Sequence, residues 1–245
     1  MWNQFRALAA RIGLTAEDVA AVERKGEPAL VEDPRNPEVQ YKVGPDPDWT
    51  QRIGEAWNQT LANSRRESAG TLLIDGGELE IADAEAFAQG VTASVVAGQY
   101  EVTFTVAHLG AEETHDYVEY VSHAFVVLQG NGGVTTIEPL TDAHGVELGV
   151  VASQIAFAKP GVLQQIAGDH AGRWTLRKSD LFFPKISEAV AVDRKFVRVT
   201  DEASGTAILL RAGQGREDYP LFRLADADGN TVGVLLDFFV DNRSW

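Results

Sequence analysis

The chain has 245 residues, no cysteine and a formal net charge of −15. Its length accommodates one large or two small domains, and the lack of cysteine excludes disulfide bonds and thiolate metal sites. The acidic balance argues against nucleic acids and anionic membrane surfaces as partners, because both bind through a basic footprint. The excess lies in residues 71–170, where Lys159 is the only basic residue beside fourteen acidic ones. Such a stretch favours association with a basic protein, although acidity also serves solubility alone.

The first residues predict no export signal. Residues 1–5 lack the basic and apolar regions of a signal peptide. The sequence contains no stretch of about twenty consecutive apolar residues, which a membrane-spanning helix would need. We therefore expect a soluble, cytoplasmic protein of bacterial type.

Residues 1–66 are predicted to form a helical N-terminal segment with a proline-rich connector. Short helices are expected at residues 3–11 and 15–25, the second with Thr15 as its N-cap. The pair has the layout of a helix-turn-helix, but its second helix begins with acidic residues, so a structural helical hairpin is preferred.

A connector and a longer helix complete this segment. Residues 27–50 contain five prolines, which indicates an extended connector without regular structure. A helix is expected at residues 49–64, where apolar residues recur every four positions: Ile53, Trp57 and Leu61. Residues 65–68 then close the helical segment.

The periodicity changes after the helical segment, and residues 67–245 are predicted to form a β-rich domain. Strands are expected at residues 71–75, 78–82, 91–96, 99–108, 117–129, 134–137, 196–200 and 206–211. In residues 99–108 apolar and polar residues alternate, which is typical of a half-buried strand. Residues 134–137 are expected to pair back onto residues 117–129 through a glycine-rich turn.

The clearest element is a C-terminal hairpin, with strands expected at residues 221–224 and 231–240. The second strand is apolar on both faces, as in the centre of a sheet. Residues 226–230 read Asp-Ala-Asp-Gly-Asn, which predicts a hydrogen-bonded turn. The same letters begin a calcium loop, but its twelfth position would be Asp237 rather than glutamate, so the turn is preferred. Together these elements predict an α+β fold, with the helical segment packed on a mostly antiparallel β sandwich or bent sheet.

Five motifs occur in a recognisable order: Gly98-Gln99-Tyr100-Glu101-Val102, then Gly213 and Gly215, Asp218-Tyr219-Pro220, Asp226-Ala227-Asp228-Gly229, and Asp237-Phe238. In this order they resemble an uncharacterised bacterial domain family, one of the domains of unknown function, over residues 70–240. The resemblance implies a fold and no particular activity. The chain departs from the family pattern at Glu147, where the family has aspartate, and in the glycine loop at Gln214 and Arg216-Glu217.

Four polar residues near the hairpin are the candidate ligand-binding residues: Glu147, Asp218, Tyr219 and Asp237. Asp237 is conspicuous because it is a carboxylate inside an apolar strand, and a buried charge must be paired or hydrogen-bonded. It has either a structural role, in a hydrogen-bonded or strand-edge position, or a role as a site carboxylate with a raised pKa. The structural role is preferred, because structural networks also perturb buried carboxylates.

Motifs for catalysis or cofactor binding are missing from the sequence. The five histidines show no metal-binding spacing, and no Gly-x-Ser-x-Gly elbow occurs. Gly213-Gln214-Gly215 is not followed by the Lys-Ser or Lys-Thr of a phosphate loop, so a turn is expected there. We expect no cofactor and no metal, and we favour a non-enzyme while leaving an enzyme open.

These observations favour a non-catalytic, acidic interaction protein, most concretely a bacterial immunity protein that binds and neutralises a basic toxin. The expected partner-binding residues are acidic and close in sequence: Glu112, Glu113, Asp116 and Glu119. The alternative is a small-ligand-binding protein or hydrolase whose pocket is formed by the four candidate residues near the hairpin. The sequence leaves the oligomeric state open.

Overall fold

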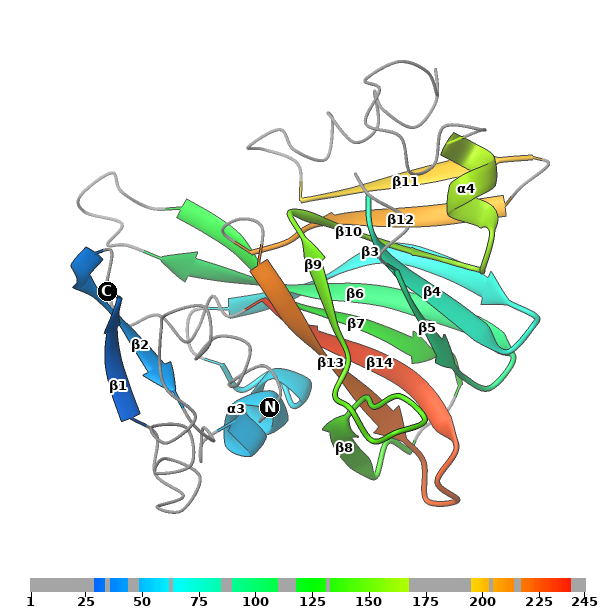
Figure 1. The fold of residues 1–245 in the computed structure, drawn as a ribbon. Helices are drawn as coiled ribbons and strands as arrows, with labels where there is room; N and C mark the ends of the chain where they lie inside the picture. The colour runs from blue at the N-terminus through cyan, green and yellow to red at the C-terminus, as the bar shows by residue number, and fades with distance from the viewer. Residues whose placement is uncertain are drawn as a thin grey trace.

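The computed structural model describes residues 29–33, 36–43, 49–61, 64–84, 90–109, 118–130, 133–167, 195–202, 205–213 and 217–238. Within these ranges the chain forms antiparallel β sheets and two short helices (Figure 1). No helix among the described residues is long and apolar enough to cross a membrane.

The larger sheet has seven strands. They are β3 (Ser64–Ile74), β6 (Gly98–Leu109), β7 (Val118–Leu128), β8 (Thr136–Pro139), β9 (Gly149–Ala152), β13 (Glu217–Ala225) and β14 (Thr231–Asp237). Their order in the sheet is β3-β6-β7-β14-β13-β8, and β9 also pairs with β13. The C-terminal hairpin therefore lies inside the sheet, with β7 on one side and β8 and β9 on the other.

The smaller sheet has five strands. They are β4 (Glu78–Asp83), β5 (Val91–Ser94), β10 (Gln154–Ala158), β11 (Phe196–Asp201) and β12 (Gly205–Arg211). Their order is β11-β12-β10-β4-β5. All five residues of the middle strand β10 are buried, because one face meets the larger sheet and the other is covered from outside.

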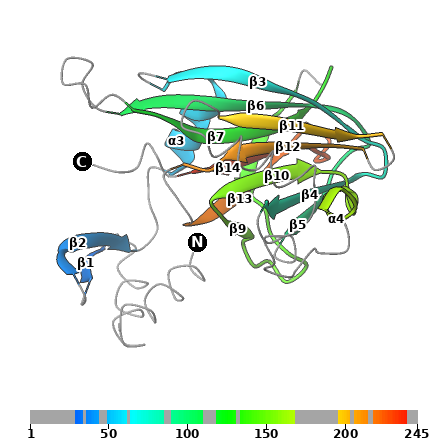
Figure 2. The ribbon, with the colours of Figure 1, turned by 90° about the horizontal axis from the view of Figure 1, so that it is seen from above.

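The main core lies between the two sheets, whose strands overlap in the view of Figure 2. Strand β6 turns every second side chain inward, from Tyr100 to Val106, and these inward side chains are 0% exposed. Phe157 and Ile208 meet them from the smaller sheet. Each large apolar side chain buried in this way stabilises the fold by about 2 kcal/mol.

Each outer face of the sandwich carries one helix (Figure 1). Helix α3 (Trp49–Trp57) covers part of the larger sheet, where Ile53 and Ala56 pack against Phe125. Helix α4 (Val162–Ala167) covers the smaller sheet. The surface beneath α4 is built from small residues: Ala82, Ala84, Ala156, Ala158 and Ala207.

The predicted C-terminal hairpin is confirmed as β13 and β14. Asp226 Oδ1 accepts hydrogen bonds from the backbone N–H groups of Asp228 and Asn230, so the turn interpretation is also confirmed. Gly229 adopts φ +80°, a left-handed conformation that glycine reaches without steric cost. The side-chain amide of Asn230 also bonds Asp226, which holds the pKa of that carboxyl below its usual range.

The predicted α+β fold is wrong, because the described residues form a mostly β structure. The helices expected at residues 3–11 and 15–25 lie outside the described residues. Where the segment 1–66 is described, it contains two strands, the nine-residue α3 and the start of β3. A helical N-terminal segment is therefore not part of the observed architecture.

The expected connector at residues 27–50 contains a hairpin of β1 (Ala29–Asp33) and β2 (Asn36–Val43). Its proline content argued against regular structure, yet Pro37 lies inside β2. The pairing shifts register between Glu32 and Asp33, close to this proline. A proline at such an irregular place in a two-stranded ribbon has no regular ladder bond to lose.

The helix expected at residues 49–64 ends at Trp57, and residues 65–68 belong to β3. Gln59 adopts φ +58°, which is incompatible with continuing the helix. The first residues of β3 have little intrinsic preference for a strand. Their conformation comes from pairing with β6, about forty positions further along the chain, for example Arg66 with Thr105.

Strand β8 was expected to pair back onto β7, and this expectation is wrong. β8 pairs with β13 instead, with Ile137 opposite Leu224. The position beside β7 is taken by β14, which is the more apolar strand and buries both faces there. A local turn signal could not reveal this competition from the end of the chain.

Candidate functional site

Four polar side chains cross the outer face of the larger sheet, beside α3. Arg66, Thr105, His123 and Asp237 are directly paired across β3, β6, β7 and β14, and we call them the polar row. Thr105 is 4% exposed, His123 0% and Asp237 1%. Cross-strand neighbours on one face lie about 5 Å apart, so this register brings the four together.

Arg66 joins the polar row to α3. Its Nη2 donates hydrogen bonds to the carbonyl oxygens of Ala56 (2.6 Å) and Trp57 (3.2 Å), at the C-terminal end of the helix. The guanidinium lies 3.8 Å from the ring centre of Phe125 and 5.9 Å from that of Trp57. A cation at a helix C-terminus is favourable, as is a cation over an aromatic face. Burial lowers the pKa of Arg66 to about 10.

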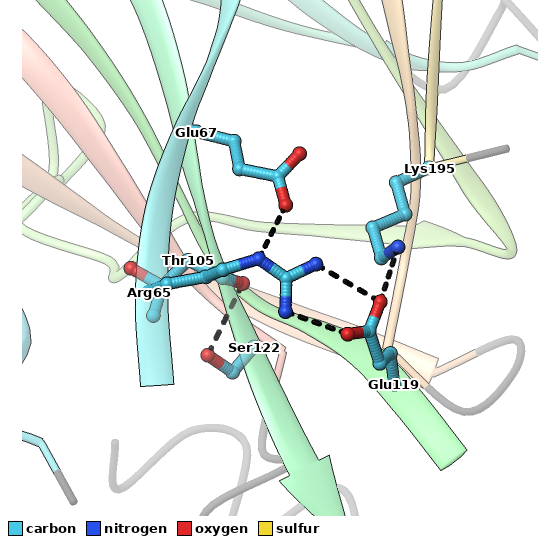
Figure 3. Close-up of polar contacts among 6 residues, drawn as sticks. All are labelled: Arg65, Glu67, Thr105, Glu119, Ser122 and Lys195. Atoms are coloured by element: carbon cyan, nitrogen blue, oxygen red, sulfur yellow. Dashed lines mark hydrogen bonds and ion pairs between the residues drawn. The ribbon is translucent and has the colours of Figure 1, made fainter. Parts of the chain in front are cut away.

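A β-bulge in β7 shapes the middle of the row. Thr105 pairs with His123, whereas the next residue of β6, Val106, pairs with Val121, so Ser122 is the extra residue. The Ser122 hydroxyl donates to the Thr105 carbonyl oxygen at 3.4 Å (Figure 3). Because a hydroxyl has one proton, the 3.1 Å contact between Ser122 Oγ and His123 Nδ1 is satisfied when Nδ1–H donates.

His123 also faces Asp237. Nε2 lies 3.6 Å from Asp237 Oδ1, beyond hydrogen-bond length but within ion-pair reach of a protonated imidazole. Serine, histidine and aspartate also compose hydrolase triads. Here Ser122 and His123 are consecutive residues, and all three side chains are at most 1% exposed. This geometry favours the structural interpretation of Asp237.

Tyr219 lies on the opposite face of the larger sheet from Asp237. It is 1% exposed and meets Phe238 edge-on, with ring centres 5.0 Å apart. Gly213 lies against this pair with φ +43°, and a Cβ there would come within 2.8 Å of the Phe238 carbonyl oxygen. The sequence prediction of a turn that requires glycine is confirmed at this position.

Asp218 and Glu147 lie apart from the two buried candidates. Asp218 is exposed and pairs with Val151 of β9. Glu147 is partly exposed and forms an isolated bridge with Thr141 in the loop before β9. The structure therefore places Tyr219 and Asp237 on opposite faces of the sheet. Asp218 and Glu147 lie at its β9 edge. A pocket shared by all four would have to span both faces, and ligand binding at them stays a prediction.

Glu119 belongs to a set of four charged residues that we call the ion-pair cluster: Arg65, Glu67, Glu119 and Lys195 (Figure 3). Arg65 donates to both carboxylate oxygens of Glu119, at 2.6 and 3.0 Å. Lys195, next to β11, bonds the same carboxylate at 2.5 Å and so links the two sheets. These bonds, chiefly that from Arg65, lower the pKa of Glu119 to about 2.

The other predicted partner-binding residues, Glu112, Glu113 and Asp116, lie outside the described residues. Glu119 is already neutralised by two basic side chains, so little of its charge is left for a partner. No local pattern predicts these ion pairs, because Arg65 and Lys195 are 54 and 76 positions away from Glu119 in the chain.

Sequence reasoning did not single out Arg66, Ser122 or His123 as a group. One signal was present: apolar and polar residues alternate only in part around Ser122-His123, as expected at a bulge. The pairing with Arg66 and Asp237 depends on sheet order and has no local signature. In the part of the chain that the structure describes, no group of three or more His, Asp or Glu side chains could hold a metal ion.

Comparison with protein-family models, with curated proteins and with solved structures found no match for the chain. The resemblance to a domain of unknown function therefore stays a prediction.

Proposed function

We propose that this protein is a non-catalytic interaction protein that binds a basic partner protein. The observation that carries the proposal is the charge on the exposed positions of residues 71–170. Acidic side chains that no described basic residue pairs with occupy exposed sites on both sheets: Glu78 of β4 and Glu101 of β6. The only basic residue of this stretch, Lys159, is paired with Asp75 at 2.6 Å.

Buried titratable groups add support. His123 and Asp237 lie buried in the polar row, where His123 Nε2 faces Asp237 Oδ1 at 3.6 Å. Reaction with a substrate requires a reachable group, whereas recognition requires only a complementary exterior. An acidic exterior accelerates encounter with a basic protein through long-range attraction.

The most concrete form of the proposal is a bacterial immunity protein that blocks a basic toxin, such as a nuclease. Nuclease surfaces that bind nucleic acid are basic, so an acidic inhibitor can occupy them through charge complementarity. The direct test is to express the product of the neighbouring gene in a bacterial host, alone and together with this protein. Growth arrest by the neighbour alone, relieved by co-expression, is the expected result.

A kinetic measurement tests the electrostatic basis with the purified pair. The association rate should fall steeply with added salt, because the screening length shortens from about 30 Å at 0.01 M to about 8 Å at 0.15 M. The double variant Glu78→Gln with Glu101→Gln should slow association and leave the free energy of unfolding unchanged. An association rate indifferent to salt, or no complex between the purified pair, would contradict the proposal.

A further inference from the structure

The proposed function leaves open which surface the partner meets. We propose that the basic partner docks on the outward face of β9 and the adjacent part of β13, with Val151 as the apolar contact and Asp218 as the carboxylate that receives an arginine or lysine. This inference rests on the proposed function and assigns it a place on the molecule.

Val151 is exposed in an otherwise buried strand. Its neighbours Val150 and Ala152 are 1% and 0% exposed, whereas Val151 is 40% exposed. The loop that leads into β9 presents a second exposed valine, Val146, at 37%. A single exposed valine needs no explanation, but here it stands directly opposite an unusual carboxylate.

That carboxylate is Asp218. No ion pair or hydrogen bond joins its side chain to another residue in the part of the chain that the structure describes. Although the residue is exposed, surrounding atoms desolvate the carboxyl and raise its pKa. Because folding raises the pKa, ionisation of this carboxyl costs stability as the pH rises above the unfolded value of 3.8. An exposed carboxyl whose charge lowers the stability of the fold is a candidate for function.

The charge around this face decides the chemistry of the partner. Residues 136–152 comprise β8, the following loop and β9, and they contain three acidic residues and no lysine or arginine. On β13 the nearest arginine, Arg223, is already paired with Glu138 of β8. An apolar contact beside an exposed carboxylate fits a partner surface with an arginine or lysine next to apolar side chains.

The test uses the full chain and two labelled peptides, one alternating arginine with valine and the other glutamate with valine. Fluorescence anisotropy at low salt measures affinity, and backbone amide shifts in NMR spectra locate the contact. We expect the arginine peptide to bind and to shift the amides of residues 149–152 and 217–220. The glutamate peptide should not bind.

Two variants test the named side chains. Asp218→Asn should weaken binding of the arginine peptide by about fivefold, and Val151→Ser by about threefold. The matched controls are Asp75→Asn, an exposed aspartate elsewhere, and Leu73→Ser, an exposed apolar residue on β3, and both should bind as wild type. Asp218→Asn should be at least as stable as wild type at neutral pH, so a loss of binding is not a loss of folding.

The outcomes separate this surface from the proposed function. If the arginine peptide binds but neither Asp218→Asn nor Val151→Ser weakens it, or the shifted amides lie elsewhere, the surface is wrong and the function stands. If neither the arginine peptide nor the purified basic product of the neighbouring gene binds at low salt, the proposed function fails as well.

Discussion

The two outer faces of the sandwich hold their helices by different physical means. Beneath α4 the smaller sheet presents alanines, and the contact is a close fit of small apolar groups. Beside α3 the larger sheet presents Phe125 and the polar row, and Arg66 bonds the end of the helix. The first contact depends on volume, whereas the second depends on the hydrogen bonds of Arg66 to α3 and on its contact with the Phe125 ring. Added side-chain volume should therefore destabilise the face beneath α4, whereas the loss of a polar group should destabilise the face beside α3.

The largest effect is expected in the polar row. Asp237→Ala removes the carboxylate that faces His123 and should lower the free energy of unfolding by about 3 kcal/mol. Urea denaturation at neutral pH measures this loss. The control is Asp75→Ala, because Asp75 has an exposed side chain paired with Lys159, and it should show no comparable change. If Asp237→Ala lowered the free energy of unfolding no more than Asp75→Ala does, the structural role proposed for the polar row would be contradicted.

On the alanine face, added volume should be harmful. Ala156→Leu places three extra carbon atoms beneath α4 at a position that is 0% exposed, and should cost about 2 kcal/mol. The loss should be the same at about pH 5 and about pH 8, the two limits between which an unperturbed histidine changes its charge. No titratable group is involved in this contact. Urea denaturation at both pH values measures it. Ala156→Ser, which hardly changes volume, should cost less, and an equal cost for both variants would argue against overpacking.

Arg66→Met should cost about 1.5 kcal/mol, because it removes the hydrogen bonds to the end of α3 and the cation over Phe125. Arg66→Lys keeps the charge but loses the planar contact, so it should fall between wild type and Arg66→Met. Chemical denaturation followed by tryptophan fluorescence suits this measurement, since Trp57 adjoins Arg66. If lysine restores the full stability, the ring contact contributes nothing.

The smallest effect is expected at the ion-pair cluster and depends on pH. The folded state lowers the pKa of Glu119 to about 2, below its unfolded value of 4.5. The carboxylate therefore contributes stability above about pH 4.5, and this contribution is lost as the pH falls towards 2. Comparing wild type with Glu119→Gln from pH 6 to about pH 2 should show the difference shrinking in acid. A constant difference would mean that Glu119 acts through packing rather than charge.

Much of the strand content could be predicted from the sequence, because alternation and turn residues are local signals. Strands β4, β6 and β7 and the β13–β14 hairpin fall where the periodicity predicts them. The start of β3 could not be found this way, because residues 65–68 become a strand only by pairing with β6. The proline content of residues 27–50 likewise hid the β1–β2 hairpin, since one irregular pairing is enough to accommodate Pro37.

The candidate site was harder to predict than the fold. Asp237 stood out as a carboxylate in an apolar strand, yet its neighbour His123 lies on the adjacent strand β7, more than a hundred positions earlier in the chain. Asp218 and Tyr219 are adjacent in sequence, but strand alternation turns one outward and the other into the core. Residues that are adjacent along a strand face opposite sides of the sheet, so their closeness in sequence did not indicate a shared pocket.

The extra residue at Ser122 sets the phase of the first half of β7. With it, both Val121 and Ala124 point into the core, which strict alternation would forbid. If Ser122 were paired in regular alternation instead of being bulged, the preceding positions would be rotated by half a turn, so that Val121 would face outward and Glu119 would turn away from Arg65 and Lys195. The bulge therefore keeps both halves of β7 in phase with the core, with Val121 opposite Val106 and Ala124 opposite Phe104.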